Sequence, residues 1–219
     1  MIQNGVSFGG VHSFNDLDLI LGEVSVSPAS PKEVFVSIPG ADGSIDITEA
    51  FGEVKYNDRT AAFAFSMNPG NDLSEAAWEK KKTEVCNRLN GLRCEITIDK
   101  DPKYYWVGRC KVNELSTAKR LRRIVVTATV APYKLKQDVT VNRFVLEKTP
   151  REYVLTNARK TVCPTFECTE SAEIVIGDST FNISTGTHKF LDIQLKEGKT
   201  PVTVSGVGTL EIKYQEGDL

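Results

Sequence analysis

The feature that most limits the fold is a regular alternation of apolar and polar residues between residues 174 and 214. Apolar side chains occupy every second position in short runs, so each run presents one face to a core. The turns that separate the runs contain glycine: Gly177-Asp178, Thr185-Gly186 and Glu197-Gly198. Short strands at near-regular spacing are typical of an antiparallel sandwich. We therefore predict such a sandwich, without a helix, for residues 135–219.

The preceding part of the chain combines strand patterns with a single helix pattern. The strand-like runs are residues 17–26, 33–38, 45–47, 61–67, 92–98, 105–112 and 121–130. After a Pro-Gly breaker, Asp72 can cap a helix with Glu75 three residues later, and Trp78, Val85 and Leu89 then recur at helical spacing. We predict one helix at about Leu73 to Asn90.

A domain boundary is predicted near Lys134, where the helical signal has ended and a polar stretch begins. The expected fold class is mainly β, with an α+β N-terminal domain at residues 1–134 and an antiparallel β-sandwich at residues 135–219. The composition of 219 residues, with 40% hydrophobic and 26% charged content, is that of a globular protein.

Charge and hydropathy exclude several classes of protein. Lys and Arg (27) nearly balance Asp and Glu (29), so the net charge of -2 provides no field that would attract nucleic acid or anionic lipid. The apolar runs are shorter than the ~18 residues that a membrane span needs. The first basic residue is Lys32, so the N-terminus is expected to be neither a secretory signal nor an Arg-rich transit peptide.

A short match to a catalytic motif occurs at residues 5–9, where Ser7 stands between two glycines in the nucleophile-elbow pattern. The elbow requires a helix after the serine, and no helix-forming segment follows Gly9. Only His12 and His188 could act as the base, and they belong to different predicted domains. We expect an ordinary hairpin serine and no catalytic residues.

Two pairs of carboxylates and two glycine loops also have structural interpretations. Asp99 with Asp101 and Asp16 with Asp18 could supply acid-base or metal chemistry, but Asp is a residue that turns recruit to bind their own backbone. The loops at residues 40–43 and 206–208 lack the residues that complete a phosphate-binding motif. Gly40 and Gly43 instead suit a tight turn that needs positive φ.

The cysteines indicate free thiols. Five of them make an odd and sparse set, and Cys163 and Cys168 have no second pair or nearby histidine with which to bind a metal. We expect no metal, no cofactor and reduced thiols. Cys86 follows Val85 on the predicted helix, and we expect it to be buried against the sheet and to differ most from the other cysteines in its setting.

Two basic clusters remain. Lys80–Lys82 is predicted to be a solvated face of the helix. The second cluster, residues 119–123, could meet an acidic partner or nucleic acid, but it lacks the interleaved aromatics that stack on bases. A protein contact or a solvated edge is therefore favoured, and no nucleic-acid binding is expected.

Several segments resemble the distal tail protein of long-tailed siphophages, in the same order along essentially the whole chain. These are IQNGVSF (2–8), IPGADGSIDIT (38–48), YNDR (56–59), APYK (131–134) and VSGVGTLEIKYQEGDL (204–219). The combination of the Ile-Pro-Gly-x-Asp-Gly segment, Pro-Tyr-Lys and the terminal Glu-Gly-x-Leu carries most of the specificity.

The resemblance implies a structural hub of a phage or prophage tail tip. In that family the N-terminal domain assembles into a hexameric ring that continues the tail tube, and the C-terminal domain is a galectin- or carbohydrate-module-like sandwich. The implied partners are further copies of the chain, the tail-tube protein, a tail-associated hub or lysin protein, and receptor-binding or baseplate proteins. The implied location is the virion tail tip, after synthesis and assembly in the bacterial host cytoplasm, without membrane association.

The alternative function is a carbohydrate-binding sandwich that mediates attachment to the host surface. Larger members of the family carry inserted sugar-binding modules, for which 85 residues leave no room. A bare sandwich would usually need an exposed aromatic platform. The candidates for it are Tyr153, Phe166, Phe181, Phe190 and Tyr214, several of which fall on alternating positions expected in the core. A hydrolase would instead need converging carboxylates. The sequence therefore favours a protein-docking role.

Overall fold

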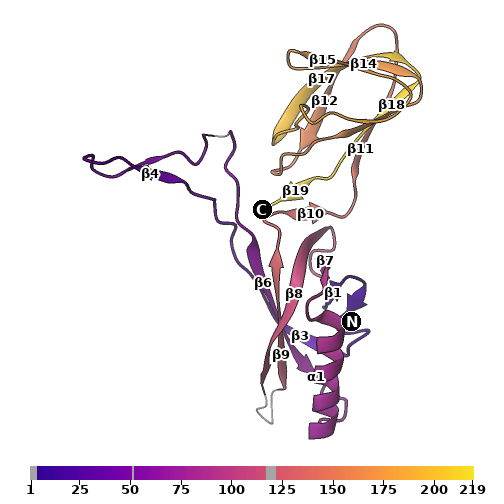
Figure 1. Ribbon diagram of the computed structural model, residues 1–219. Helices are drawn as coiled ribbons and strands as arrows, with labels where there is room; N and C mark the ends of the chain where they lie inside the picture. Colours follow the sequence, from indigo (N-terminus) through magenta and orange to yellow (C-terminus); the bar gives the residue numbers. More distant parts are fainter. Residues whose placement is uncertain (1–3, 51, 117–121) are drawn as a thin grey trace. The chain divides into compact units, whose positions relative to one another are not determined.

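The computed structural model describes residues 4–50, 52–116 and 122–219, without the side chains of residues 114–116 (Figure 1). The chain forms two compact units, Met1–Pro132 and Tyr133–Leu219. The architecture is mainly β with one helix among the described residues, which confirms the predicted fold class. The described part of the chain contains no helix of the length and apolar character that a membrane crossing demands.

The first unit is built on an antiparallel sheet whose strands follow the order β2-β1-β7-β8-β9-β6-β3. The strands are β1 (Val6–Phe8), β2 (Val11–His12), β3 (Leu19–Val26), β6 (Arg59–Met67), β7 (Arg93–Ile98), β8 (Tyr104–Ser116) and β9 (Arg123–Val130). Sequence-distant strands lie next to each other in this order. The core therefore depends on pairings that local periodicity does not define.

Aromatic side chains from two of these strands, β1 and β6, form the centre of the first core. Phe8 of β1 packs edge-on against Phe63 of β6, with ring centroids 5.4 Å apart and an interplanar angle of 86°. Phe65 packs on the same ring at 6.2 Å. All three side chains are fully buried. Edge-to-face packing of this kind adds about 0.5–1.5 kcal/mol per pair to the burial of the rings themselves.

The helix α1 (Glu75–Leu89) covers this core with the predicted residues Trp78, Val85 and Leu89, each of which is buried. The predicted cap is wrong by two residues. Ser74, not Asp72, accepts a hydrogen bond from the Ala77 N–H and caps the helix. Asp72 instead accepts from the backbone N–H and the hydroxyl of Ser74, both at 2.8 Å, because an aspartate can close a turn on the second residue after it.

The prediction for Cys86 is also wrong. Its side chain is half-buried, whereas Cys110 and Cys168 are the buried cysteines. One step along a helix rotates the side chain by about 100°, so Cys86 leaves the core-facing stripe that Val85 occupies.

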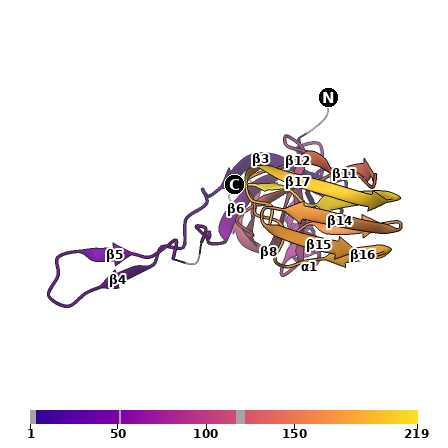
Figure 2. The same cartoon turned by 90° about the horizontal axis from the view of Figure 1, so that it is seen from above.

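A long excursion between β3 and β6 leaves the sheet (Figures 1 and 2). It contains the hairpin of β4 (Phe35–Ser37) and β5 (Ser44–Asp46), which pair only with each other. An isolated bridge between Pro31 and Tyr56 closes its base. We call residues 31–56 the arm. The two strand patterns predicted in this region are present, but they contribute no strand to the main sheet.

The second unit has two four-stranded antiparallel sheets, ordered β11-β18-β13-β16 and β12-β17-β14-β15. Their strands are β11 (Thr140–Val145), β12 (Arg151–Asn157), β13 (Thr165–Cys168), β14 (Ser171–Ile176), β15 (Ser179–Ile183), β16 (Gly186–Lys189), β17 (Gly198–Val207) and β18 (Thr209–Tyr214). The short strands β10 (Lys134–Lys136) and β19 (Gly217–Asp218) pair with each other. One apolar cluster draws residues from both sheets, including Leu155 and Phe166, which gives this unit a sandwich core.

Candidate functional site: an apolar arm and two charged grooves

The serine of the elbow-like motif and His12 lie on adjacent strands, as Cα partners in the β1–β2 pair. The imidazole is already occupied. Its Nε2 atom lies 3.1 Å from Asp99 Oδ2, and its Nδ1 atom accepts from the backbone N–H groups of Phe14 and Asn15 at 3.2 and 3.1 Å. Two donors at Nδ1 place the imidazole proton on Nε2. No lone pair is left to take a proton from Ser7, so the pair lacks the arrangement of a nucleophile and its base.

The other residues considered for acid-base chemistry bind their own chain. His188 Nε2 lies 2.9 Å from the carbonyl oxygen of Ser184 in the second unit. Asp16 accepts from the His12 N–H at 2.7 Å. Asp18 accepts from the side-chain amides of Asn68, at 2.9 Å, and Asn71, and these hydrogen bonds lower the pKa of its carboxyl.

The remaining carboxylates and the glycines of residues 40–43 lie in turns or bends, whereas Gly206 lies within β17. Asp99 accepts from the Gly5 N–H at 2.7 Å, and the Asp101 N–H donates to Ile98 across the β7–β8 turn. Gly40 and Gly43 have φ values of 83° and 76° at the tip of the arm, in agreement with the expected tight turn. These carboxylates and glycines therefore serve to shape turns of the backbone, as the sequence analysis favoured.

The structure brings together two cysteines that the sequence analysis did not single out. Cys94 of β7 and Cys110 of β8 have their Sγ atoms 3.9 Å apart. Burial raises the pKa of Cys110 to about 12 and also raises that of Cys94. Such thiols are protonated at neutral pH, so they are poor nucleophiles. Among the described residues, no group of three or more His, Cys, Asp or Glu side chains is placed to hold a metal ion.

Both basic clusters are largely neutralised within the chain where they are described. Lys81 pairs with Glu84 at 2.8 Å and Lys82 with Glu79 at 2.5 Å on α1. Arg123 pairs with Glu23 at 3.2 Å. Arg122 reaches the Ser74 carbonyl and Glu75 at the start of α1, while residues 119–121 of the predicted cluster lie outside the described residues.

The arm exposes apolar side chains that a monomeric fold would normally bury. Those between 44% and 56% exposed are Val34, Phe35, Val36, Ile38 and Ile45. The arm begins at Pro31 and ends at Tyr56, which form a bridge at its base. Its two strands, β4 and β5, pair only with each other. Contiguous exposed apolar residues mark surfaces that contact another molecule. The sequence pattern identified these strands but did not indicate that their apolar side chains pack against no buried core.

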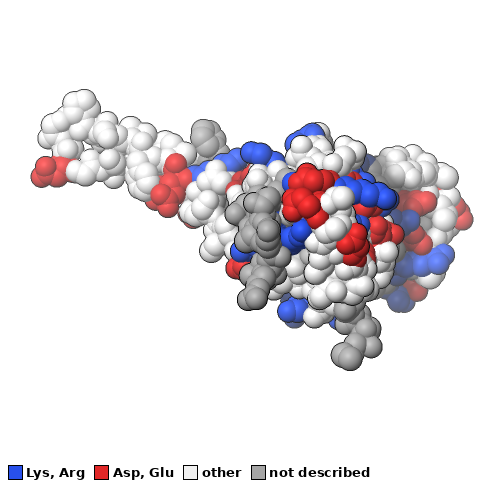
Figure 3. All heavy atoms as spheres, turned by 90° about the horizontal axis from the view of Figure 1, so that it is seen from below, with Lys and Arg blue, Asp and Glu red and all other residues white. Residues whose placement is uncertain are grey.

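A groove of about 530 Å³ lies at the base of the arm. We call it the acidic groove, because its charged lining residues are Glu33, Asp46 and Glu49. Hydrogen bonds from Thr48 lower the pKa of Asp46 and keep that carboxylate charged. On the face drawn in Figure 3, acidic atoms are prominent along the arm.

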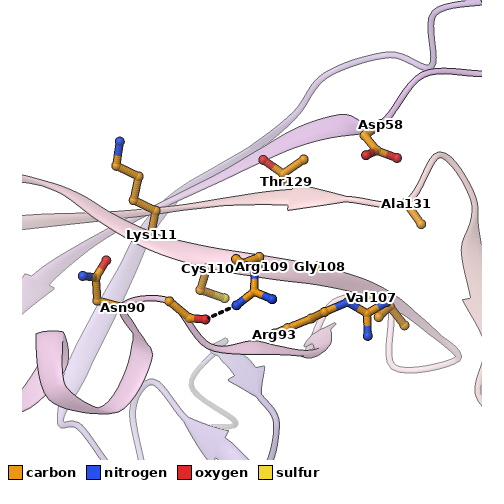
Figure 4. A pocket seen from close by; sticks show the side chains of 11 residues that line it. Asp58, Asn90, Arg93, Val107, Gly108, Arg109, Cys110, Lys111, Thr129 and Ala131 are labelled. Carbon is orange, nitrogen blue, oxygen red and sulfur yellow. Dashed lines mark hydrogen bonds between the residues drawn. The ribbon is translucent and has the colours of Figure 1, made fainter.

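A second groove of about 630 Å³ lies over β7, β8 and β9, and we call it the basic groove (Figure 4). Arg93 projects from β7 and Arg109 and Lys111 from β8, while Asp58 supplies its one carboxylate. The Nη1 atom of Arg109 donates to the Gly91 carbonyl at 2.7 Å. Within the described residues, the side chains of Arg93 and Lys111 have no hydrogen bond or ion pair.

The aromatic candidates for a sugar platform in the second unit pack in or against its core. Phe166 and Tyr214 are buried, and Tyr153, Phe181 and Phe190 are partly buried against the same cluster. Phe181 and Phe190 have ring centroids 5.1 Å apart. Two of these five rings are therefore buried, and the other three are only partly accessible.

The comparisons with known proteins add a likeness of fold. No protein family model and no curated protein matches this sequence. Among solved structures, the SPP1 Dit (gp 19.1) protein, a paradigm of the hub adsorption apparatus in Gram-positive infecting phages, has a TM-score of 0.69 over 99% of both chains, at 15% sequence identity. A de novo designed double-stranded β-helix covers 37% of this chain with a TM-score of 0.26, at 14% sequence identity. The chain shares the fold of the SPP1 Dit protein over both units.

Proposed function

We propose that this protein is the structural hub of a phage or prophage tail tip, located at the end of the virion tail. The observation that carries the proposal is the likeness of fold to a phage hub protein across the entire chain, rather than over one common β-sandwich. The segments that resemble the distal tail protein family occur in the same order and support the same function.

In the proposed assembly, six copies close into a ring that joins the tail tube to the adsorption apparatus. Residues 1–134 would build the ring, and residues 135–219 would dock neighbouring tail proteins. The number six comes from the family resemblance. A head-to-tail contact must close by rotation to avoid a filament, and it requires two different surfaces on each chain. The exposed apolar arm supplies one such surface.

The same proposal assigns the protein no catalytic activity. The His12 imidazole and the Asp16, Asp18 and Asp99 carboxylates are engaged by the chain's own hydrogen bonds, as a scaffold would use them. The alternative of a sugar-binding sandwich receives no support from the five aromatic residues that were its candidates.

The test is to replace residues 32–55 by a short Gly-Ser linker between Pro31 and Tyr56, which are bridge partners and so leave the ends of the cut close together. Light scattering and negative-stain images at high concentration, with and without the neighbouring tail proteins, would measure assembly. The intact chain is expected to form six-membered rings, whereas the armless variant should stay monomeric with an unchanged thermal unfolding temperature. An intact chain that forms only a twofold dimer under every condition, with residues 38–48 between the copies, would contradict the proposal.

A further inference from the structure

We propose that the acidic groove of the arm in one copy docks against the basic groove over β7–β9 in the next copy. This inference rests on the proposed function, because it specifies the contact by which copies of the chain assemble. It names the two surfaces that meet and the chemistry that pairs them.

The basic groove contains three cationic side chains and only one carboxylate, so its positive charge is not fully neutralised within the described chain. Arg93 and Arg109 are Cα partners across β7 and β8, and Lys111 follows two residues later on the same face of β8. Like charges directly opposite each other on a sheet destabilise it. The one carboxylate of the groove, Asp58, leaves an excess of two positive charges. An incoming anionic surface would relieve this repulsion.

The acidic groove has the opposite character. Its lining contains Glu33, Asp46 and Glu49 and no Lys or Arg. Of the two lysines in the arm, Lys55 pairs with Glu53 at 3.4 Å. The carboxylates stand beside the exposed apolar side chains of β4 and β5, so a surface that covers the arm must be cationic in one part and apolar in another.

A second copy of this chain fits both requirements. The two grooves are different surfaces of opposite charge on one chain, and a head-to-tail contact needs two different surfaces that complement each other. Val107 and Ala131 add apolar surface to the lining of the basic groove. Complementary charge sets the register of such a contact and speeds encounter, while apolar burial supplies most of its free energy.

The test is an exchange of charge between the grooves. One variant carries Arg93→Glu and Lys111→Glu, and the other carries Glu33→Lys and Glu49→Lys. These four side chains have no ion pair in the described structure, so the fold should tolerate the changes. Each variant alone should associate at least about tenfold more weakly than the unaltered chain, because like charges then meet at every contact. An equimolar mixture should recover assembly when the two variants alternate. The groove that has become acidic in one variant then meets the arm that has become basic in the other, and the next contact joins the two unaltered grooves.

Matched controls reverse the same number of charges elsewhere. Lys80→Glu with Lys100→Glu, and Glu152→Lys with Asp178→Lys, lie on exposed positions outside both grooves and should leave association unchanged. Light scattering gives the degree of assembly, and thermal unfolding checks that every variant is folded.

Two outcomes would overturn the inference and leave the hub function intact. In the first, both groove variants assemble as well as the intact chain. In the second, neither variant assembles alone and their mixture does not assemble either. That result would assign the grooves to other partners, such as an acidic segment of another tail protein. Failure of the unaltered chain to assemble under any condition would instead count against the proposed function itself and, with it, this contact.

Discussion

The His12 imidazole donates from Nε2 to Asp99 Oδ2 at 3.1 Å, across 87 positions of the sequence. The same oxygen accepts from the Gly5 N–H at 2.7 Å, and the other ring nitrogen holds the backbone of Phe14 and Asn15. One imidazole therefore ties the first strands of the sheet to the β7–β8 turn. The contact explains why two residues of catalytic type lie together without forming an active site.

Gly5→Ala should destabilise the first unit through this contact. A Cβ atom at position 5 would lie 2.4 Å from His12 Cε1 and 2.5 Å from Nε2, so the ring would have to leave Asp99. We expect a loss of roughly 1–3 kcal/mol in the free energy of unfolding, measured by urea titration. Gly22→Ala is the control, because its nearest contact is an ordinary 3.5 Å to the Ala64 carbonyl. Equal stability of the two variants would show that the His12–Asp99 contact contributes nothing to the free energy of unfolding.

Asp18→Asn should reduce stability at neutral pH and have little effect in acid. Hydrogen bonds from Asn68 and Asn71 lower the pKa of Asp18 below its ordinary value of 3.8, so the folded state favours the charged form. That stabilisation is present above the unfolded-state pKa and disappears as the pH falls through the folded-state value.

Asparagine also tolerates the φ of 53° at position 18, so this substitution tests the charge and not the backbone. Urea unfolding at pH 7 should show a loss of about 1 kcal/mol. The difference between the variant and the intact chain should shrink steadily on acidification. A difference that does not change with pH would contradict the role given to the carboxylate.

Cys110 should make the protein less stable in alkali. Its pKa is raised from 9.0 to about 12, first by burial, so the unfolded thiol ionises at a lower pH than the folded one. The unfolded state therefore binds fewer protons between these two values, and the free energy of unfolding falls as the pH rises through this window. Below the unfolded-state pKa, the contribution of Cys110 is constant.

Cys110→Ala should weaken this alkaline dependence, although loss of the buried sulfur lowers stability at neutral pH. Urea unfolding of the reduced protein on both sides of the ordinary thiol pKa gives the comparison, with Cys86→Ala as the control for removal of a half-buried thiol. An alkaline loss of stability that is as steep in the Cys110 variant as in the intact chain would contradict this assignment.

Asn157 should be among the most sensitive polar positions of the second unit. Its Nδ2 atom donates to the carbonyls of Lys160 and Leu195, both at 2.8 Å, while its side chain is buried and its Oδ1 has no hydrogen-bond partner. Asn157→Ala removes these two hydrogen bonds from the site, although the Leu195 carbonyl keeps its bond from the Val162 N–H at 3.0 Å, and should cost about 1–3 kcal/mol.

Asn157→Asp should cost more than the alanine variant, because it places a carboxylate against carbonyl oxygens in a buried site. The neighbouring exposed residue provides the control, and Thr156→Ala should change the free energy of unfolding by less than about 0.5 kcal/mol. Thermal and urea unfolding would rank the three variants. The reverse order of the Asp and Ala variants would show that Asn157 acts through its shape alone.

The sequence by itself determined the local elements. Alternation with a period of two identified the strands from β3 to β9 and, in the sandwich, β14, β15, β17 and β18, because successive side chains of a strand point to opposite faces. It did not identify β11, β12 and β13. The helical spacing of Trp78, Val85 and Leu89 identified the buried face of α1. Gly40 and Gly43 identified the turn at the tip of the arm, because the required φ is a property of single residues.

The tertiary structure decided which of these elements share a core. The apolar patterns of β4 and β5 look like those of core strands, yet they pair only with each other and remain exposed. The His12–Asp99 contact, the Cys94–Cys110 approach and the placement of three cations in one groove all join separate strands. Periodicity records which side of a strand is apolar, but neither the neighbouring strand nor its register. Those depend on long-range pairing, and the two charged grooves exist only once that pairing has formed.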